Sequence, residues 1–204
     1  GLYRTEYLFL ERKTMPDVQE QQKEYEKVFD LLDGKELIVR TLDIGGDKRV
    51  PYLPQEQEEN PFLGVRGIRF TLKHPEILEA QMEAMLLAAK GRPFSIMLPM
   101  VDTVQEVEQA RAIWDKVCKK VAENGVAVNP DIRIGITIET PAAAICVDTF
   151  IGKADFVSIG SNDLAQYVMA ADRESVELDH LLSPWQTAIM RMIQHVIWIC
   201  NERG

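Results

Sequence analysis

The sequence predicts an α/β protein built on a parallel sheet, and a (β/α)8 TIM-type barrel is the favoured architecture. Short apolar runs alternate with longer amphipathic stretches along all 204 residues, a pattern typical of βαβ units. Hydrophobic residues make up 46% of the chain, which is enough for a sizeable core. We count about five strands and a possible strand end at Gly1–Tyr3, whereas a whole barrel has eight. The chain is therefore expected to be a barrel fragment, and a six-stranded doubly wound domain is the alternative.

The first third of the chain predicts a helix, a strand and a long loop. Apolar residues recur at helical spacing within the polar stretch Pro16–Leu32, and Pro16 suits the first turn of a helix. The apolar run Leu37–Val39 is typical of a buried parallel strand. A glycine pair and three prolines lie within Asp43–Gly64, so a long loop is expected there.

The rest of the chain continues the alternation of strands and helices. Helices are expected near Pro75–Ala89 and Val104–Asn124, from Pro141 onward, and over about Pro184–Glu202. The expected strands are Ser95–Met100, Ile132–Ile138 and Phe156–Ile159. No repeat or linker divides the chain into separate domains.

Composition excludes several classes of protein. With 23 Lys and Arg against 32 Asp and Glu, the formal net charge is −9, which would repel a nucleic acid. No apolar run approaches the roughly 18–20 residues of a membrane span, and the N-terminal residues do not resemble a signal peptide. Three widely spaced cysteines indicate neither a disulfide framework nor a zinc site. A soluble protein of the reducing cytoplasm is expected.

Candidate ligand-binding residues follow the predicted strands. In both architectures ligands bind beyond the carboxyl ends of the strands, where this sequence places Arg4, Arg40, Glu139 and Asp163, with Arg66 near the loop end. Glu139 directly follows one strand, and Asp163 is expected to follow the next strand after a Gly-Ser-Asn turn. Two such carboxylates suit Mg²⁺, and guanidinium groups pair bidentately with phosphate or carboxylate. A magnesium-bound phosphorylated carboxylic acid is the ligand that this set predicts.

Four of these residues, Arg4, Arg40, Glu139 and Asp163, lie in motifs that resemble one family, the phosphoenolpyruvate-binding domain of Enzyme I of the bacterial phosphotransferase system. The motifs occur in the family's order and span nearly the whole chain. They are Gly1–Glu6 (GLYRTE), Arg40–Lys48 (RTLDIGGDK), Glu59–Gly64 (ENPFLG), Glu139–Ala143 (ETPAA) and Ser158–Tyr167 (SIGSNDLAQY).

The resemblance implies specific roles for seven residues. Glu139 and Asp163 would bind Mg²⁺. The residues that would bind phosphoenolpyruvate are Arg4, Arg40, Arg66, Asn162 and Arg173. Of these, Arg173 is assigned by the resemblance alone.

The resemblance also implies a phosphoryl transfer that these residues would not complete by themselves. In the family, the phosphoryl group passes to a histidine on an amino-terminal domain and then to a histidine-containing carrier protein for sugar uptake. Neither that domain nor the family's proton-donating cysteine is present, so residues 1–204 are expected to be one incomplete barrel domain, truncated before its last two strand–helix units. By itself it is expected to be inactive and to form a homodimer.

Three other functions stay open on the sequence alone. Pyruvate phosphate dikinase and phosphoenolpyruvate synthase are similar around Asn162–Asp163, although the other motifs match them less well. A magnesium-dependent barrel lyase or aldolase that acts on a 2-oxo acid would also use a Glu and an Asp. A regulatory module that senses phosphoenolpyruvate would bind it without turnover.

Overall fold

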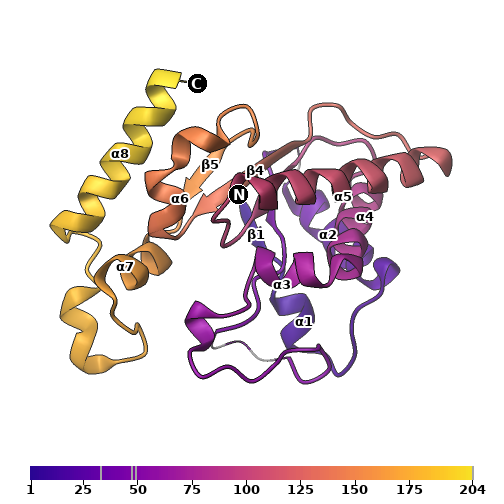
Figure 1. The fold of residues 1–204 in the computed structure, drawn as a ribbon. Coiled ribbons are helices and arrows are strands. Elements are labelled where there is room, and N and C mark those ends of the chain that lie inside the picture. The colour runs from indigo at the N-terminus through magenta and orange to yellow at the C-terminus, as the bar shows by residue number, and fades with distance from the viewer. Residues whose placement is uncertain (33, 47, 49, 204) are drawn as a thin grey trace.

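A five-stranded parallel sheet forms the centre of the computed structural model, which describes residues 1–32, 34–46, 48 and 50–203. The sheet curls into a half-barrel with helices on its outside, as expected for a fragment of a TIM-type barrel (Figure 1). The strands pair in chain order, and each lies parallel to the next. They are β1 (Leu2–Arg4), β2 (Ile38–Arg40), β3 (Ser95–Leu98), β4 (Arg133–Ile138) and β5 (Val157–Ile159).

The central strands are buried on both faces, which explains their continuous apolar runs. All four residues of β3 are buried, and β4 is buried from Ile134 onward. The edge strands β1 and β5 are more exposed. The sequence predicted about five strands in addition to the strand end at Gly1–Tyr3. The described residues form five strands including β1, so the predicted number of strands was too high.

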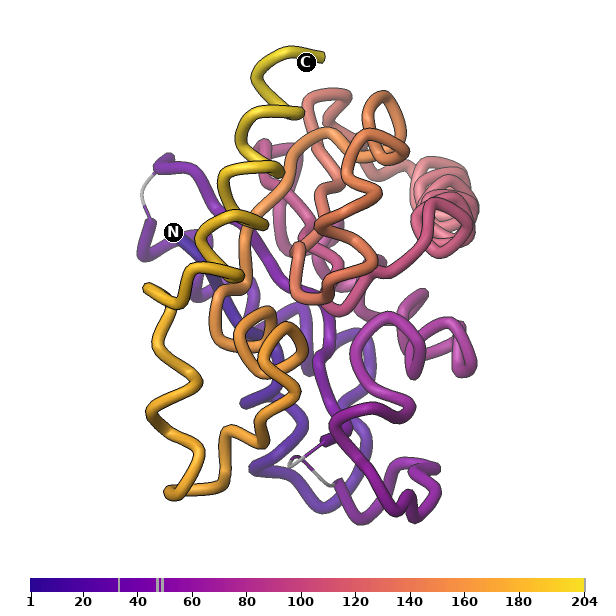
Figure 2. The backbone as a smooth tube through the Cα atoms, turned by 60° about the vertical axis from the view of Figure 1, so that its left-hand side comes forward, coloured from indigo at the N-terminus to yellow at the C-terminus, as the bar shows by residue number. Residues whose placement is uncertain are grey.

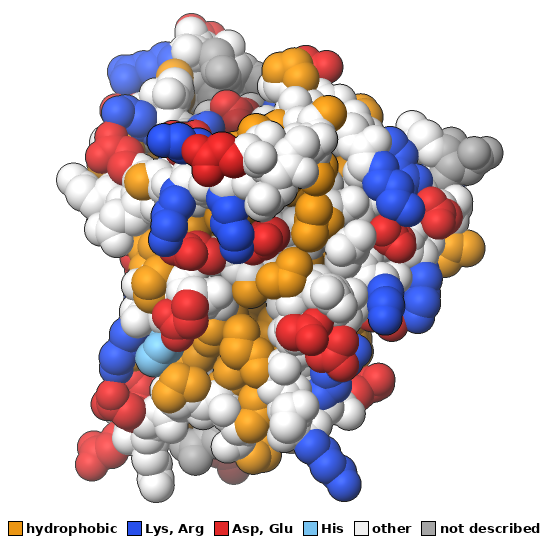
Figure 3. Space-filling view, turned by 90° about the vertical axis from the view of Figure 1, so that its right-hand side faces the viewer, with side chains coloured by type: hydrophobic (Ala, Val, Ile, Leu, Met, Phe, Trp, Pro, Cys, Tyr) orange, Lys and Arg blue, Asp and Glu red, His pale blue; other side chains and the backbone are white. Residues whose placement is uncertain are grey.

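On one side of the molecule, α4 (Pro75–Ala89) packs against both α2 (Val18–Leu32) and α5 (Val104–Glu123) (Figure 1). All three confirm predicted helices. Helix α2 starts two residues later than expected, because the Asp17 side chain accepts the Glu20 N–H at 2.8 Å and so caps the helix there. The face that carries these helices mixes charges of both signs with apolar side chains (Figure 3).

The second half of the helical layer contains α6 (Pro141–Ile145), α7 (Ser161–Met169) and α8 (Thr187–Arg203). Both α6 and α7 contact α8. The last helix begins three residues later than predicted, and the chain that leads into it, 170–186, lies at the outside of the molecule (Figure 2). Two short 3-10 segments, Val147–Phe150 and Val176–Leu181, complete this half.

Three α-helices of the described residues were not predicted. They are α1 (Tyr7–Leu10), α3 (Ile68–Lys73) and α7, of which the first two are too short to show a clear period. The prediction of a Gly-Ser-Asn turn before Asp163 was wrong, because α7 begins at Ser161 and a single residue separates it from the end of β5. Within the described residues, the long loop over 43–64 is confirmed except for the 3-10 turn Pro61–Leu63, and Asp47 and Arg49 of the loop lie outside the described residues. Among the described helices, none has the length and apolar character to cross a bilayer.

Candidate active site

Arg40 occupies the carboxyl end of β2, where its guanidinium group is held by three carboxylates. Its Nη2 lies 2.5 Å from Glu6 Oε1 and 3.3 Å from Asp43 Oδ2, and its Nη1 lies 3.8 Å from Glu139 Oε1. Burial lowers the pKa of Arg40, but these carboxylates outweigh burial and raise it. Arg40 is therefore a buried permanent cation at the expected edge of the sheet.

Arg66 reaches the same edge from the end of the long loop. Its Nη2 donates to both carboxylate oxygens of Asp43, at 3.3 and 3.2 Å, and its Nη1 donates to Asp163 Oδ1 at 2.7 Å and to Tyr167 Oη at 3.3 Å. Gly45 permits this approach, because a Cβ at that position would lie 2.5 Å from Arg66 Cβ and its φ is +105°. Asp43 thus joins Arg40 and Arg66 in one network.

Asp163 lies in the first turn of α7, immediately beyond the end of β5. Its Oδ1 accepts hydrogen bonds from Arg66 Nη1 and, at 3.1 Å, from Arg173 Nη1. Arg173 also lies over the ring of Phe62, 4.9 Å from its centroid, and its backbone N–H donates to Gln166 Oε1 at 3.2 Å. Segments that are distant in the sequence therefore meet at Asp163.

Glu139 is the first residue after β4 and is almost completely buried. Its Oε2 accepts the Met100 N–H at 2.8 Å, and Met100 has the left-handed φ of 58°. A Cβ at residue 160 would lie 2.5 Å from Glu139 Cγ, so glycine is required there. Burial, followed by the charges of Asp43 and Asp163, raises the pKa of Glu139 to about 7.

The structure joins five of the seven predicted site residues in this network. They are Arg40, Arg66, Glu139, Asp163 and Arg173. Arg4 pairs in register with Arg40 but is exposed, and Asn162 is exposed beside Asp163. Within the described part of the chain, the Arg4 and Asn162 side chains make no hydrogen bond or ion pair.

Sequence reasoning missed three residues of the network: Glu6, Asp43 and Tyr167. Glu6 and Asp43 stand in the quoted motifs beyond the ends of β1 and β2, so the strand-end criterion that selected Arg40 could have selected them. Tyr167 lies four residues after Asp163 and would face the same side of a helix, but that helix was not predicted.

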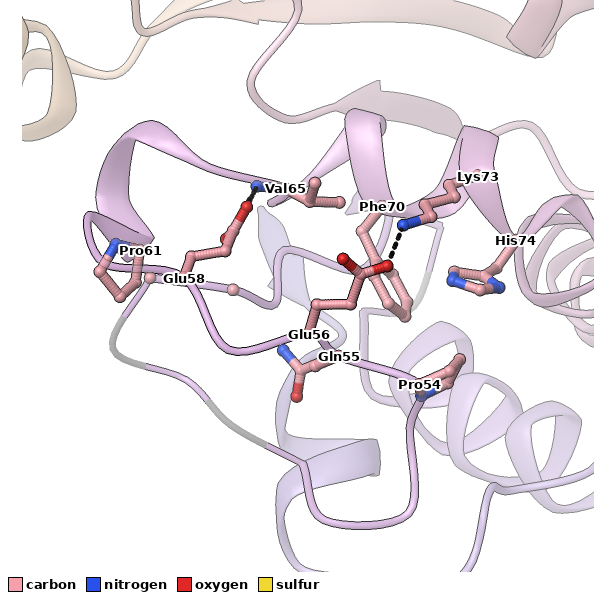
Figure 4. A pocket seen from close by; sticks show the side chains of 11 residues that line it. Pro54, Gln55, Glu56, Glu58, Pro61, Val65, Phe70, Lys73 and His74 are labelled. Carbon is pink, nitrogen blue, oxygen red and sulfur yellow. Dashed lines mark hydrogen bonds and ion pairs between the residues drawn. The ribbon is translucent and has the colours of Figure 1, made fainter.

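Two pockets adjoin the network. A cavity of about 400 Å³ lies between segment 59–63 and α7, and its lining includes Phe62 and Tyr167, which both contact site arginines. A much smaller one of about 30 Å³ lies between residues 45–46 and 54–61 on one side and α3 on the other (Figure 4). At this second pocket, the Glu58 carboxylate accepts the Val65 N–H at 3.0 and 3.1 Å and so holds the chain just before Arg66.

The chemistry of the carboxylates fits a hard cation. The described residues contain no group of three His, Cys, Asp or Glu side chains placed to hold a metal. Glu139 and Asp163 nevertheless lie close enough that the charge of Asp163 raises the pKa of Glu139. A divalent cation would relieve this repulsion, and Mg²⁺ commonly takes only one or two protein carboxylates.

Comparisons with known proteins show similarity over the whole chain. A family model described as "PEP-utilising enzyme, PEP-binding domain" matches residues 1–204. The chain is 45% identical over 204 residues to the phosphoenolpyruvate-protein phosphotransferase of Staphylococcus carnosus, and 44% identical to those of Staphylococcus epidermidis and Bacillus subtilis. Each match covers 100% of this chain and 36% of the relative, so the chain spans about a third of the length of these proteins.

Proposed function

The chain belongs to the PEP-binding domain family of the PEP-utilising enzymes, and from this premise we propose that it binds phosphoenolpyruvate for a phosphoenolpyruvate–protein phosphotransferase. The observation that carries the proposal is the convergence of Arg40, Arg66 and Arg173 with two carboxylates at the carboxyl edge of the sheet. Phosphoenolpyruvate carries a phosphate and a carboxylate, which are the groups that guanidinium forks bind bidentately.

The arginines bind the substrate by exchanging partners. Arg66 and Arg173 both donate to Asp163, so a phosphate that binds them takes over hydrogen bonds that this carboxylate now accepts. The Nε groups of Arg40 and Arg66 are buried and have no hydrogen-bond partner within the described residues. Arg4 and Asn162, exposed beside the network, supply further donors.

Glu139 and Asp163 are the residues that would hold Mg²⁺. The cation would neutralise charge on the phosphate and stabilise the charge that develops during phosphoryl transfer. The two side chains come from the ends of neighbouring strands, and the Met100 N–H orients Glu139.

The transfer itself requires groups outside these residues. The phosphoryl group would pass to a histidine of another domain and then to a histidine-containing carrier protein that serves sugar uptake. Residues 1–204 would form part of one barrel domain, inactive by itself, within a cytoplasmic homodimer.

Calorimetric titration of the full-length protein with phosphoenolpyruvate, in Mg²⁺ and in EDTA, tests this function. We expect Mg²⁺-dependent binding that Glu139→Gln or Asp163→Asn abolishes without unfolding the protein. Glu36→Gln is the matched control, because Glu36 pairs with Arg133 at the opposite, amino end of the strands. Binding that both site variants retain would refute the assignment. Turnover of a 2-oxo acid by the protein would favour a lyase instead.

A further inference from the structure

Glu6 is a buried carboxylate to which neither the motifs nor the proposed chemistry assigns a role. Its side chain is only 4% exposed, and it follows β1 by two residues. We propose that Glu6 is a positioning residue that sets the direction of the Arg40 guanidinium group for phosphoenolpyruvate. The proposal rests on the proposed function, because it concerns how that site binds its ligand.

The two residues that follow Arg4, the last residue of β1, contact both the backbone and the guanidinium group of Arg40. Thr5 Oγ1 donates to the backbone carbonyl of Arg40 at 2.9 Å, and Glu6 Oε1 accepts from the guanidinium Nη2 at 2.5 Å. Both contacts are buried. Two successive residues therefore fix where the Arg40 side chain starts and where it ends.

Unlike Asp43, the Glu6 carboxylate is not shared among several cations. Asp43 lies 3.3 Å from Arg40 and is shared with Arg66 and, at 3.9 Å, with Lys48. Within the described residues, the Glu6 carboxylate pairs with Arg40 and with no other cation. Without it, the attraction of Asp43 and Glu139 would draw the guanidinium group of Arg40 towards them.

A positioning role and a simple charge effect predict opposite results. Glu6 is an anion within an anion-binding site, so if only its charge mattered, Glu6→Gln would tighten the binding of phosphoenolpyruvate. If Glu6 orients Arg40, the same variant weakens binding. Glu6→Asp keeps the charge but shortens the side chain by one methylene, so only the positioning role predicts a loss for this variant.

The test is calorimetric titration of the full-length protein and its variants with phosphoenolpyruvate in Mg²⁺. We expect Glu6→Gln and Glu6→Asp to weaken binding about tenfold or more, the usual scale for a charge-assisted hydrogen bond. Glu36→Gln alters an exposed Glu–Arg pair at the other end of the sheet, and this variant should bind phosphoenolpyruvate as the wild type does. In an Arg40→Lys background, Glu6→Gln should have little further effect, because its partner fork is already lost.

Each outcome decides one claim. Unchanged or tighter binding by both Glu6 variants overturns the positioning role and leaves the proposed function standing. A full loss from Glu6→Gln that persists in the Arg40→Lys background shows a role that does not pass through Arg40. A wild type that binds no phosphoenolpyruvate refutes the proposed function, and with it the role of Glu6.

Discussion

Replacing Glu139 with glutamine is expected to stabilise the metal-free protein while removing a proposed metal ligand. Burial and the charges of Asp43 and Asp163 raise the pKa of Glu139 from 4.5 to about 7. Since one pKa unit corresponds to about 1.4 kcal/mol, the ionised carboxylate destabilises the folded protein by about 3 kcal/mol at pH 8. Glutamine is neutral, and its side-chain oxygen can still accept the Met100 N–H.

The sign of this effect depends on pH. The folded protein binds the Glu139 proton more tightly than the unfolded chain does, so wild-type stability falls as the pH rises from about 4.5 to about 7. Glutamine does not titrate. The advantage of Glu139→Gln should therefore be about 3 kcal/mol at pH 8, shrink to about 1 kcal/mol at pH 5.5 and vanish near pH 4.

Urea denaturation in EDTA at these three pH values measures the difference in free energy of unfolding. Glu36→Gln is the control for loss of a carboxylate, and it should show no comparable pH-dependent gain, because Glu36 is largely exposed. A Glu139→Gln protein that is no more stable than the wild type at pH 8, or whose advantage does not change with pH, would refute the reasoning.

Two further substitutions test other parts of the network, and a third tests the cap of a nearby helix. Arg40→Lys keeps the charge but loses the bidentate fork, so it should weaken phosphoenolpyruvate binding by about 1–3 kcal/mol in calorimetry, and unaltered affinity would contradict this. Asp43→Asn removes the carboxylate between buried Arg40 and Arg66 and should cost about 3–5 kcal/mol of unfolding free energy in urea, whereas a cost below about 1 kcal/mol would contradict the pairing. Thr140→Ala removes the cap that accepts the Ala143 N–H, so a loss of about 1 kcal/mol is expected in the same assay, and no loss would exclude capping.

Much of the fold follows from periodicity and local signals. The helix over Pro75–Ala89 has the predicted ends, because Pro75 starts it and Lys90 ends it in a left-handed conformation. Elements fixed mainly by tertiary contacts were missed. The short α3 contacts α4 and α5, and its first residue, Ile68, is fully buried, so packing rather than local sequence accounts for it.

The candidate site could be predicted only in part, for a reason that lies in its construction. Strand ends are local features of the sequence, and they located Arg40, Glu139 and Asp163. Arg66 and Arg173 follow a loop and a helix, and long-range contacts bring them to Asp163 across 97 and 10 residues. No spacing rule encodes such a contact. The position of Arg66 near the end of the loop made it a candidate, whereas only the resemblance to the family assigned Arg173.

The ion pairs among the site residues influence which anions the proposed site would select. Arg66 and Arg173 already donate to Asp163, and Asp43 is shared between Arg66 and Arg40, so a ligand gains only the difference between its own ion pairs and those that it replaces. A monoanion such as pyruvate offers one carboxylate, so it replaces an aspartate carboxylate as partner of the arginines without adding negative charge. Phosphoenolpyruvate offers a phosphate and a carboxylate, enough to engage more than one guanidinium group at once. The ion pairs that hold the arginines in place without ligand therefore favour a multiply charged substrate over the product left when its phosphoryl group has gone.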